Sequence, residues 1–240
     1  MAISPSFSID ELQKQFETAS YDTILKWVAA EYGSAFSLAC SFGAEDVVLL
    51  DALLKIDPNA RVFVLDTGRL HQETYEVMER FRGRYGVAFE VYSPDTVSLQ
   101  NLLRAKGPSS FYESIDNRKE CCGIRKVEPL KRALAGQKAW ITGLRREQAV
   151  TRLALPKAEI DLSHGGILKL NPLADWTEAR VWQYIRTNDV PYNALHDKGF
   201  PSIGCVPCTR AVLPGEDLRA GRWWWEAPEH KECGLHTKRK

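Results

Sequence analysis

Four of the six cysteines in the 240-residue sequence form two close pairs. Cys121 and Cys122 are adjacent, and Cys205 and Cys208 form a CxxC motif, a common ligand pair for zinc or an iron–sulfur cluster. Adjacent cysteines point in different directions, which makes it awkward for both to reach one zinc ion, whereas each thiolate of a [4Fe–4S] cluster binds its own iron. The two pairs therefore favour a [4Fe–4S] cluster over zinc, and four buried free thiols are the alternative.

A fifth cysteine, Cys233, lies near the C-terminus among the cationic or titratable residues Lys231, His236 and Lys238. An exposed thiol among cations ionises more readily, and a chain end suits a nucleophile that meets two partners in turn. The position predicts a nucleophile, with a surface cysteine of no function as the alternative. Cys40, inside an apolar run, is expected to pack in the core.

The elements that must position these thiols alternate between strand and helix over the first two-thirds of the chain. Strands are expected at 36–40, 61–65, 87–91 and 140–142, and helices at 45–56, 71–81 and 96–105. From about Glu159 the pattern is irregular, apart from a helix at 177–187. The alternation predicts a single α/β domain over 1–240, with a mostly parallel twisted sheet, helices on both faces, and an irregular C-terminal extension at 205–240.

Ligands of such sheets bind beyond the carboxyl ends of the strands, which directs attention to the loops 41–46, 66–71 and 143–152. In the first loop, backbone N–H groups and the helix N-terminus could face an anion. A simple tight turn, with Gly43 at positive φ, explains that loop equally well. In the second loop, Asp66 could accept a hydrogen bond from a ribose or adenine, and Arg69 could pair with phosphate. Asp66 could equally cap the next helix.

The third loop carries Arg145, Arg146 and Arg152. The guanidinium group binds phosphate or sulfate oxygens with two parallel hydrogen bonds, although a solvated surface loop would also carry such residues. Together the three loops predict a site for a nucleotide-like anion.

Composition excludes several classes of protein. A net charge of +1 argues against a nucleic-acid partner, no apolar run approaches the ~20 residues of a membrane span, and no secretory signal is visible. We therefore expect a soluble, cytoplasmic protein. Basic residues concentrate in 118–132, 143–152 and 205–240, so the overall neutrality leaves room for a small dianion in one basic pocket.

Six segments together resemble a known family: KECCGIRKVEPL, LDTGR, TGLRREQ, GCVPCTR, RAGRWWWE and the terminal ECGLH. They are similar to the phosphoadenylyl-sulfate (PAPS) and adenylyl-sulfate (APS) reductases of the adenine-nucleotide α-hydrolase-like superfamily, over about residues 35–236. The resemblance implies reduction of APS to sulfite and AMP through a cysteine S-sulfonate, in sulfate assimilation and cysteine biosynthesis. It implies thioredoxin or a glutaredoxin-like protein as reductant, and a homo-oligomer.

The resemblance also assigns roles to individual residues. It implies that Cys233 is the nucleophile and that Lys126, Arg219 and Arg222 serve the sulfate group. One [4Fe–4S] cluster per subunit would be held by Cys121, Cys122, Cys205 and Cys208. The nucleotide would be bound by Ser41, Gly43, Asp66, Thr67, Gly68, Arg69, Gly143, Arg145 and Arg146.

Other functions remain open on the sequence. PAPS enzymes of this family usually lack the four cluster cysteines, so their presence favours APS, with PAPS or dual use as the alternative. An ATP-dependent adenylating or thiolating enzyme fits less well, because the ECGLH tail has no role there. Near-neutral charge argues against a zinc-stabilised nucleic-acid-binding module.

Overall fold

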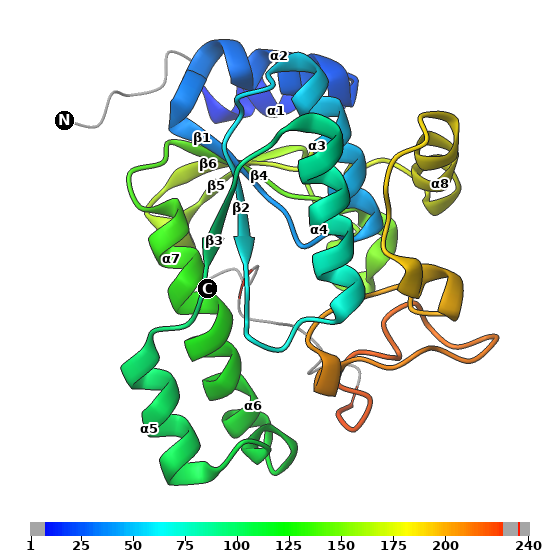
Figure 1. Cartoon of the computed structure of the whole chain (residues 1–240). Helices are drawn as coiled ribbons and strands as arrows, with labels where there is room; N and C mark the ends of the chain where they lie inside the picture. The colour runs from blue at the N-terminus through cyan, green and yellow to red at the C-terminus, as the bar shows by residue number, and fades with distance from the viewer. Residues whose placement is uncertain (1–7, 228–234, 236–240) are drawn as a thin grey trace.

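A six-stranded sheet forms the centre of the computed structural model, which describes residues 8–227 and Leu235 (Figure 1). The strand order is β3-β2-β1-β4-β6-β5, and every neighbouring pair is parallel except β5 with β6. The strands are β1 Phe36–Ala39, β2 Val62–Leu65, β3 Phe89–Tyr92, β4 Ala139–Ile141, β5 Ala158–Asp161 and β6 Ile167–Leu170. The predicted mostly parallel sheet is confirmed, with strand boundaries within two residues of those expected for β1 to β4.

Both faces of the central strands are buried, as expected for strands read as continuous apolar runs. Along β2, Val62 and Val64 enter the main core while Phe63 between them enters a second cluster on the opposite face. In β4, Ile141 and Trp140 divide in the same way. Successive side chains of a strand point to opposite faces, so each short strand helps to build both cores.

Eight α-helices are described: α1 Ile9–Glu17, α2 Tyr21–Tyr32, α3 Ala44–Ile56, α4 Gln72–Tyr85, α5 Thr96–Lys106, α6 Ile115–Cys122, α7 Glu128–Leu134 and α8 Glu178–Thr187. Apolar residues of α1 to α4 and of α8 join the main core, whereas α7 covers the other face with Leu130, Ala133 and Leu134. Figure 1 shows α3, α4 and α8 on one side of the sheet and α7 on the other. Within the described residues, no helix has the length and apolar character needed to cross a membrane.

The antiparallel pair β5–β6 corrects the expectation that the chain is irregular from Glu159. Charged residues interrupt both strands, which weakens their apolar pattern. In the sheet, however, Glu159 lies directly opposite Lys169, and their side chains pair at 3.0 Å. Opposite charges on facing residues stabilise an antiparallel pair, so these charges are compatible with the hairpin.

A π-helical turn, Gly123–Val127, joins α6 to α7 in one helical run. Such turns insert an extra residue per turn and are frequent at functional sites. This one follows Cys122 directly and carries Arg125 and Lys126. Residues 205–227 contain one short helical turn, Val206–Cys208, and an isolated bridge between Thr209 and Arg222, so this part of the predicted extension is irregular.

Candidate active site

A cavity of about 580 Å³ lies beyond the carboxyl ends of β1, β2 and β4. In the sheet, β2 lies on one side of β1 and β4 lies on the other. The loops that follow β1 and β4 therefore lead away from each other. Such a switch point is where open α/β sheets bind ligands. All three loops singled out in the sequence contribute to the wall, for example through Ser41, Thr67 and Gly143.

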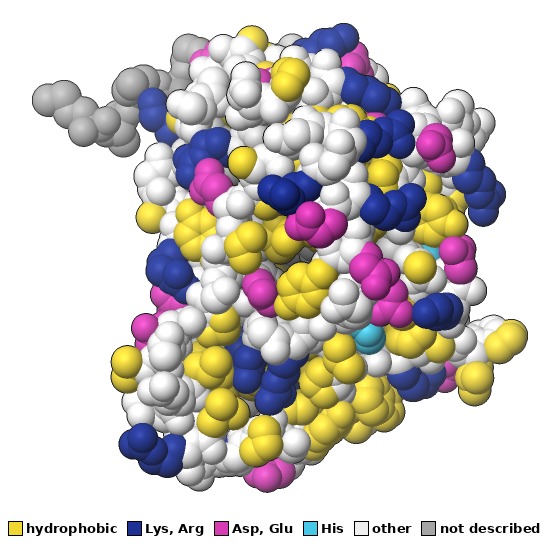
Figure 2. Space-filling view, in the orientation of Figure 1, with side chains coloured by type: hydrophobic (Ala, Val, Ile, Leu, Met, Phe, Trp, Pro, Cys, Tyr) yellow, Lys and Arg dark blue, Asp and Glu magenta, His cyan; other side chains and the backbone are white. Residues whose placement is uncertain are grey.

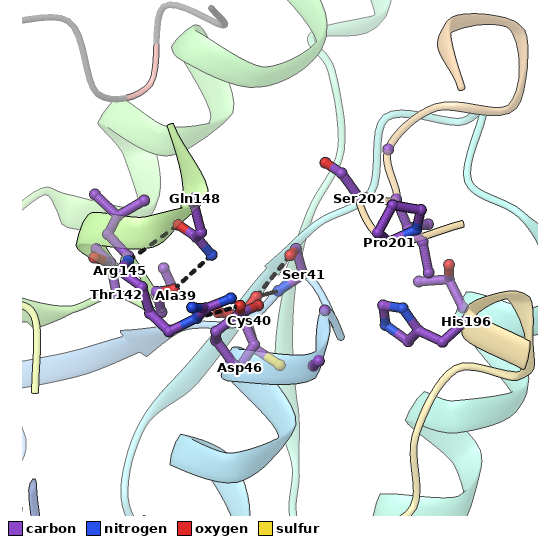
Figure 3. A pocket seen from close by; sticks show the side chains of 18 of the residues that line it. Ala39, Cys40, Ser41, Asp46, Thr142, Arg145, Gln148, His196, Pro201 and Ser202 are labelled. Atoms are coloured by element: carbon purple, nitrogen blue, oxygen red, sulfur yellow. Dashed lines mark hydrogen bonds and ion pairs between the residues drawn. The ribbon is translucent and has the colours of Figure 1, made fainter. Parts of the chain in front are cut away.

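Asp46 and Ser41 are hydrogen-bonded to each other in the first loop (Figure 3). The Oδ2 atom of Asp46 accepts hydrogen bonds from the Ser41 backbone N–H at 2.7 Å and from its hydroxyl at 2.6 Å. Burial raises the pKa of Asp46 to about 6, although the two bonds from Ser41 act in the opposite direction. The Asp46 carboxyl group therefore titrates near pH 6.

The conformation of this loop differs from the expected one in detail. Gly43 has φ −68° and caps α3, so its predicted positive φ is wrong. The positive φ, 59°, belongs to Phe42, which is fully buried with its ring 5.3 Å from that of Phe89. A bulky residue adopts this backbone region only when its surroundings enforce it, and here the packing of Phe42 in the core does so.

The arginines of the third loop have different surroundings. Arg145 is buried on the cavity wall, and its Nε donates to Glu45 at 2.7 Å. Arg152 also lines the cavity. Arg146 is not among the lining residues, because its guanidinium pairs with Glu17 of α1 at 2.8 Å. The structure therefore places Arg145 and Arg152 at the site and Arg146 elsewhere.

The second loop serves two cavities. Thr67 lines the larger cavity, the one of about 580 Å³, and its Oγ1 lies 3.2 Å from Cys205 Sγ. Asp66 accepts from the Gly68 backbone at 2.8 Å and from the Tyr75 hydroxyl at 2.9 Å, and neither Asp66 nor Gly68 is among the described residues of the cavity wall. Arg69 stacks over the Phe111 ring at 4.9 Å and lines the cysteine cavity described next. Of the residues predicted to bind the nucleotide, Arg69 therefore lies at the cysteine cavity and is not among the described residues of the larger one.

The cysteine cavity is a second, small cavity whose wall contains all four paired cysteines together with Arg69, Phe111, Arg118, Arg125 and Lys126. Burial raises the pKa of Cys208 to about 12. Burial also acts to raise the pKa of Cys205, but Lys126, the Thr67 hydroxyl and Arg222 outweigh it and hold that pKa below its usual value. Among residues 8–227 and Leu235, no three Cys, His, Asp or Glu side chains are arranged to hold a metal ion.

Lys126 lies on the wall of both cavities. Arg219 and Arg222 also line the larger one. Arg222 Nη1 donates to the Ser202 hydroxyl at 3.3 Å and to the Ile203 carbonyl at 3.2 Å, and its guanidinium stacks over Trp223 at 4.7 Å. Figure 2 shows hydrophobic side chains gathered on the lower part of the molecule, with basic side chains beside them, in the region of α6 and of residues 199–227 in Figure 1.

Sequence reasoning missed several residues of the larger cavity. Arg186 lines it from α8, and His196 from the segment that follows. Leu235 also lines it and packs against the cluster that contains Trp140. The apolar period of α8 predicted a helix but gave no sign of a ligand, and His196 belongs to no recognisable motif. The proposed nucleophile Cys233 lies outside the described residues.

Comparisons with known proteins agree with this geometry. A family model described as the phosphoadenosine phosphosulfate reductase domain matches residues 35–211. The chain is 51% identical over 234 residues to the adenosine 5′-phosphosulfate reductase of Allochromatium vinosum, covering 98% of this chain and 90% of that protein. It is 48% identical over 240 residues to the enzyme of that name from Pseudomonas aeruginosa strain LESB58, covering 98% and 89%.

A plant protein and a solved structure are also similar. The Arabidopsis thaliana protein named 5′-adenylylsulfate reductase 1, chloroplastic, is 47% identical over 95% of this chain and 50% of its own length. The crystal structure of PAPS reductase from Candida auris in complex with phosphate matches with a TM-score of 0.74 and 31% identity, over 88% of this chain and 99% of that one.

Proposed function

The chain belongs to the phosphoadenosine phosphosulfate reductase family, and from this relationship we propose that it reduces adenosine 5′-phosphosulfate (APS) to sulfite and AMP in assimilatory sulfate reduction. The observation that carries the proposal is that Lys126 lies on the wall of both the nucleotide-sized cavity and the four-cysteine cavity. APS is a small dianion with an adenosine at one end and a sulfate at the other. It needs a pocket of this size with cations at one end.

The adenosine part is assigned to the edge of the sheet where β1 and β4 diverge. Ser41, Thr67 and Gly143 contribute polar or backbone groups there. The phosphosulfate is assigned to the cations Lys126, Arg219 and Arg222. Transfer of a sulfuryl group spreads negative charge over its oxygens, so fixed cations stabilise the transition state. Arg222 is suited to this role because Ser202, Ile203 and Trp223 hold its guanidinium in place.

The nucleophile of this scheme is Cys233. Its thiolate attacks the sulfur atom of APS, the bond from that sulfur to the bridging oxygen breaks, and AMP leaves with that oxygen. The product on the protein is a Cys233 S-sulfonate. Leu235, which belongs to the same ECGLH segment in the sequence, lines the cavity.

The second half-reaction needs a dithiol reductant, for which we propose thioredoxin or a glutaredoxin-like protein. One thiolate of the reductant attacks Cys233 Sγ and displaces sulfite, forming a mixed disulfide. The second thiol of the reductant then releases the Cys233 thiolate and closes the reductant's own disulfide. Two electrons pass from the dithiol to the sulfur that leaves as sulfite.

We propose that the cysteine cavity holds a [4Fe–4S] cluster. All four paired cysteines line this cavity, and a cluster binds each thiolate at a separate iron, which suits the adjacent pair Cys121 and Cys122. Arg125 Nε and Trp223 Nε1 are buried beside these cysteines without a partner in the described part of the chain, and such donors suit sulfide and thiolate sulfur. Cys121, Cys122, Cys205 and Cys208 would hold the cluster. When bound, it supplies a fixed charge distribution beside Lys126.

The test begins with anaerobic purification, an iron and sulfide count, and an assay of sulfite release with thioredoxin. We expect four iron and four sulfide ions per chain, and turnover of APS in preference to PAPS. Equal kcat/KM for the two nucleotides would instead indicate dual use, and failure to turn over APS would overturn the proposal.

Two cysteine variants separate the roles of the thiols. Cys233→Ser should form no S-sulfonate on incubation with APS, as measured by intact-protein mass spectrometry, while it still binds AMP. Cys40→Ser is the comparison: Cys40 lines the larger cavity and lies outside the cysteine cavity, so this variant should keep the wild-type iron content and should still form the S-sulfonate. An adduct on the Cys233→Ser protein would assign the nucleophile to another residue.

A further inference from the structure

His196 lines the larger cavity and has no role in the reaction described above. It lies in a short helical turn, Ala194–Lys198, that follows α8. Figure 3 shows its ring pointing into the cavity, across from Ser41, which follows β1, and from Asp46 in the first turn of α3. The imidazole therefore faces the side of the cavity to which the adenosine is assigned.

The ring is held on two sides. It forms a T-shaped pair with Trp182, with the ring centroids 5.1 Å apart and an interplanar angle of 82°. The backbone of Phe200 hydrogen-bonds the imidazole. Nε2 is buried and has no hydrogen-bond partner among the described residues, so the bond to Phe200 uses Nδ1. A buried polar atom without a partner costs free energy unless a ligand or water satisfies it.

The state of the ring follows from these contacts. Burial lowers the pKa of His196, and this outweighs Glu45, the Phe200 backbone and Asp197, which raise it. The imidazole is therefore neutral at pH 7. The contact with Phe200 favours the protonated ring, as donation from Nδ1–H to a carbonyl does. A neutral ring that donates from Nδ1 has a bare lone pair on Nε2, and this nitrogen can only accept a hydrogen bond.

We propose that His196 Nε2 accepts a hydrogen bond from the adenosine part of the nucleotide. Resting on the proposed function, this inference adds a residue that recognises the nucleoside. The phosphate and sulfate groups of APS are ionised and carry acceptors only, so they cannot satisfy Nε2. The donors on adenosine are the two ribose hydroxyls and the exocyclic amino group of adenine.

His71 offers a matched control within the same protein. Its Nε2 is also buried without a partner in the described chain, and burial lowers its pKa as well. Its ring packs against Phe200, with the centroids 5.9 Å apart. His71 differs from His196 in one respect that matters here, which is that it is not among the residues that line the cavity.

The first experiment measures AMP binding by calorimetry in the purified holoenzyme. His196→Phe keeps a ring of similar size but removes the acceptor, and should weaken AMP binding about tenfold, the effect of one lost hydrogen bond. His196→Gln places an amide near the position of Nε2 and should recover most of the affinity. His71→Phe should bind AMP within about twofold of wild type. Thermal unfolding of each variant establishes that it is folded.

The second experiment identifies the donor with three nucleotides that each lack one: 2′-deoxy-AMP, 3′-deoxy-AMP and purine riboside 5′-monophosphate. The tenfold difference between wild type and His196→Phe should disappear for one of them. If it disappears for 3′-deoxy-AMP, the acceptor also disfavours a 3′-phosphate, and His196→Phe should narrow the preference for APS over PAPS.

Two results would overturn the inference: equal AMP affinity of wild type and His196→Phe, or an unchanged tenfold difference for all three analogues. Either leaves the proposed function intact, because that function predicts AMP binding and APS turnover by the wild-type protein. Failure of the wild type to bind AMP at all would overturn the proposed function instead.

Discussion

Gly143 packs against Asp46 so closely that a Cβ atom on Gly143 would overlap the Asp46 carboxylate and lie 2.9 Å from Glu45 Cβ. The contact joins the loop after β4 to the first turn of α3. Gly143, Glu45 and Asp46 all line the cavity, so the contact forms part of its wall at the switch point of the sheet. A glycine is required here for close approach, since there is no room for any side chain.

Gly143→Ala should therefore distort the nucleotide site. We expect a loss of about 1–3 kcal/mol in the free energy of unfolding, as for other overpacking substitutions, and at least a tenfold loss of AMP affinity. Urea denaturation and calorimetry measure the two effects. Gly83→Ala in α4 is the control, because a Cβ there meets nothing within 4 Å. In a helix that change should be neutral or stabilise by up to about 1 kcal/mol. Unchanged AMP affinity in Gly143→Ala would contradict the prediction.

The raised pKa of Asp46 predicts a stability difference that depends on pH. Its pKa in the folded protein is about 6, against 3.8 as the ordinary value, so between these values the folded state binds more protons at this site than the unfolded state. The contribution of Asp46 to stability is therefore greatest below pH about 4 and is lost as pH rises through 6.

Asp46→Asn removes this dependence. The difference in free energy of unfolding, wild type minus variant, should fall from pH 4 to pH 6 and level off above pH 7. Urea denaturation across that range measures the difference directly, and subtraction cancels the titration of all other groups. A difference that rises with pH would mean that the hydrogen bonds from Ser41 outweigh burial and that the carboxylate is ionised throughout.

Arg118 and Glu226 form a buried ion pair that ties α6 to residues 205–227. Arg118 Nε and Nη2 donate to the two carboxylate oxygens at 2.9 and 2.8 Å, and the side chains are 1% and 3% exposed. Arg118→Met leaves the Glu226 carboxylate buried without its partner, and should cost about 3–5 kcal/mol of unfolding free energy. Adding Glu226→Leu should recover most of that loss.

The control for this pair is Lys106–Glu120, whose side chains are 41% and 42% exposed. Lys106→Met should change stability by less than about 1 kcal/mol, because water screens an exposed pair. Urea denaturation of the four proteins tests both statements. A double variant as unstable as Arg118→Met would show that the loss comes from packing and not from an unpaired charge.

Arg69 and Arg145 should separate the functions of the two cavities. Arg69 lines the cysteine cavity and Arg145 the larger one. Arg69→Met should lower the iron content of the purified protein and leave AMP affinity within about twofold of wild type. Arg145→Met should weaken AMP binding and leave the iron content unchanged, because it frees Glu45 beside the nucleotide. The reverse pattern would instead support the phosphate contact that the sequence suggested for Arg69.

The sequence by itself determined the alternation of strands and helices, the three loops at the strand ends, and the two pairs of cysteines. These features depend on local periodicity and residue type. A buried parallel strand such as β2 reads as an apolar run whatever packs against it, and a CxxC brings its two thiols together within one turn. Neither the apolar run nor the CxxC motif depends on which distant residues pack against it.

Only the tertiary structure decided which side chains face which cavity. Arg145 and Arg146 are adjacent in the chain, yet one lines the nucleotide-sized cavity and the other pairs with Glu17 on α1. His196 and Ser41 are far apart in the sequence, and only the fold places them on opposite sides of one cavity (Figure 3). The partners of these residues come from distant elements, and no local pattern records the packing that brings such elements together.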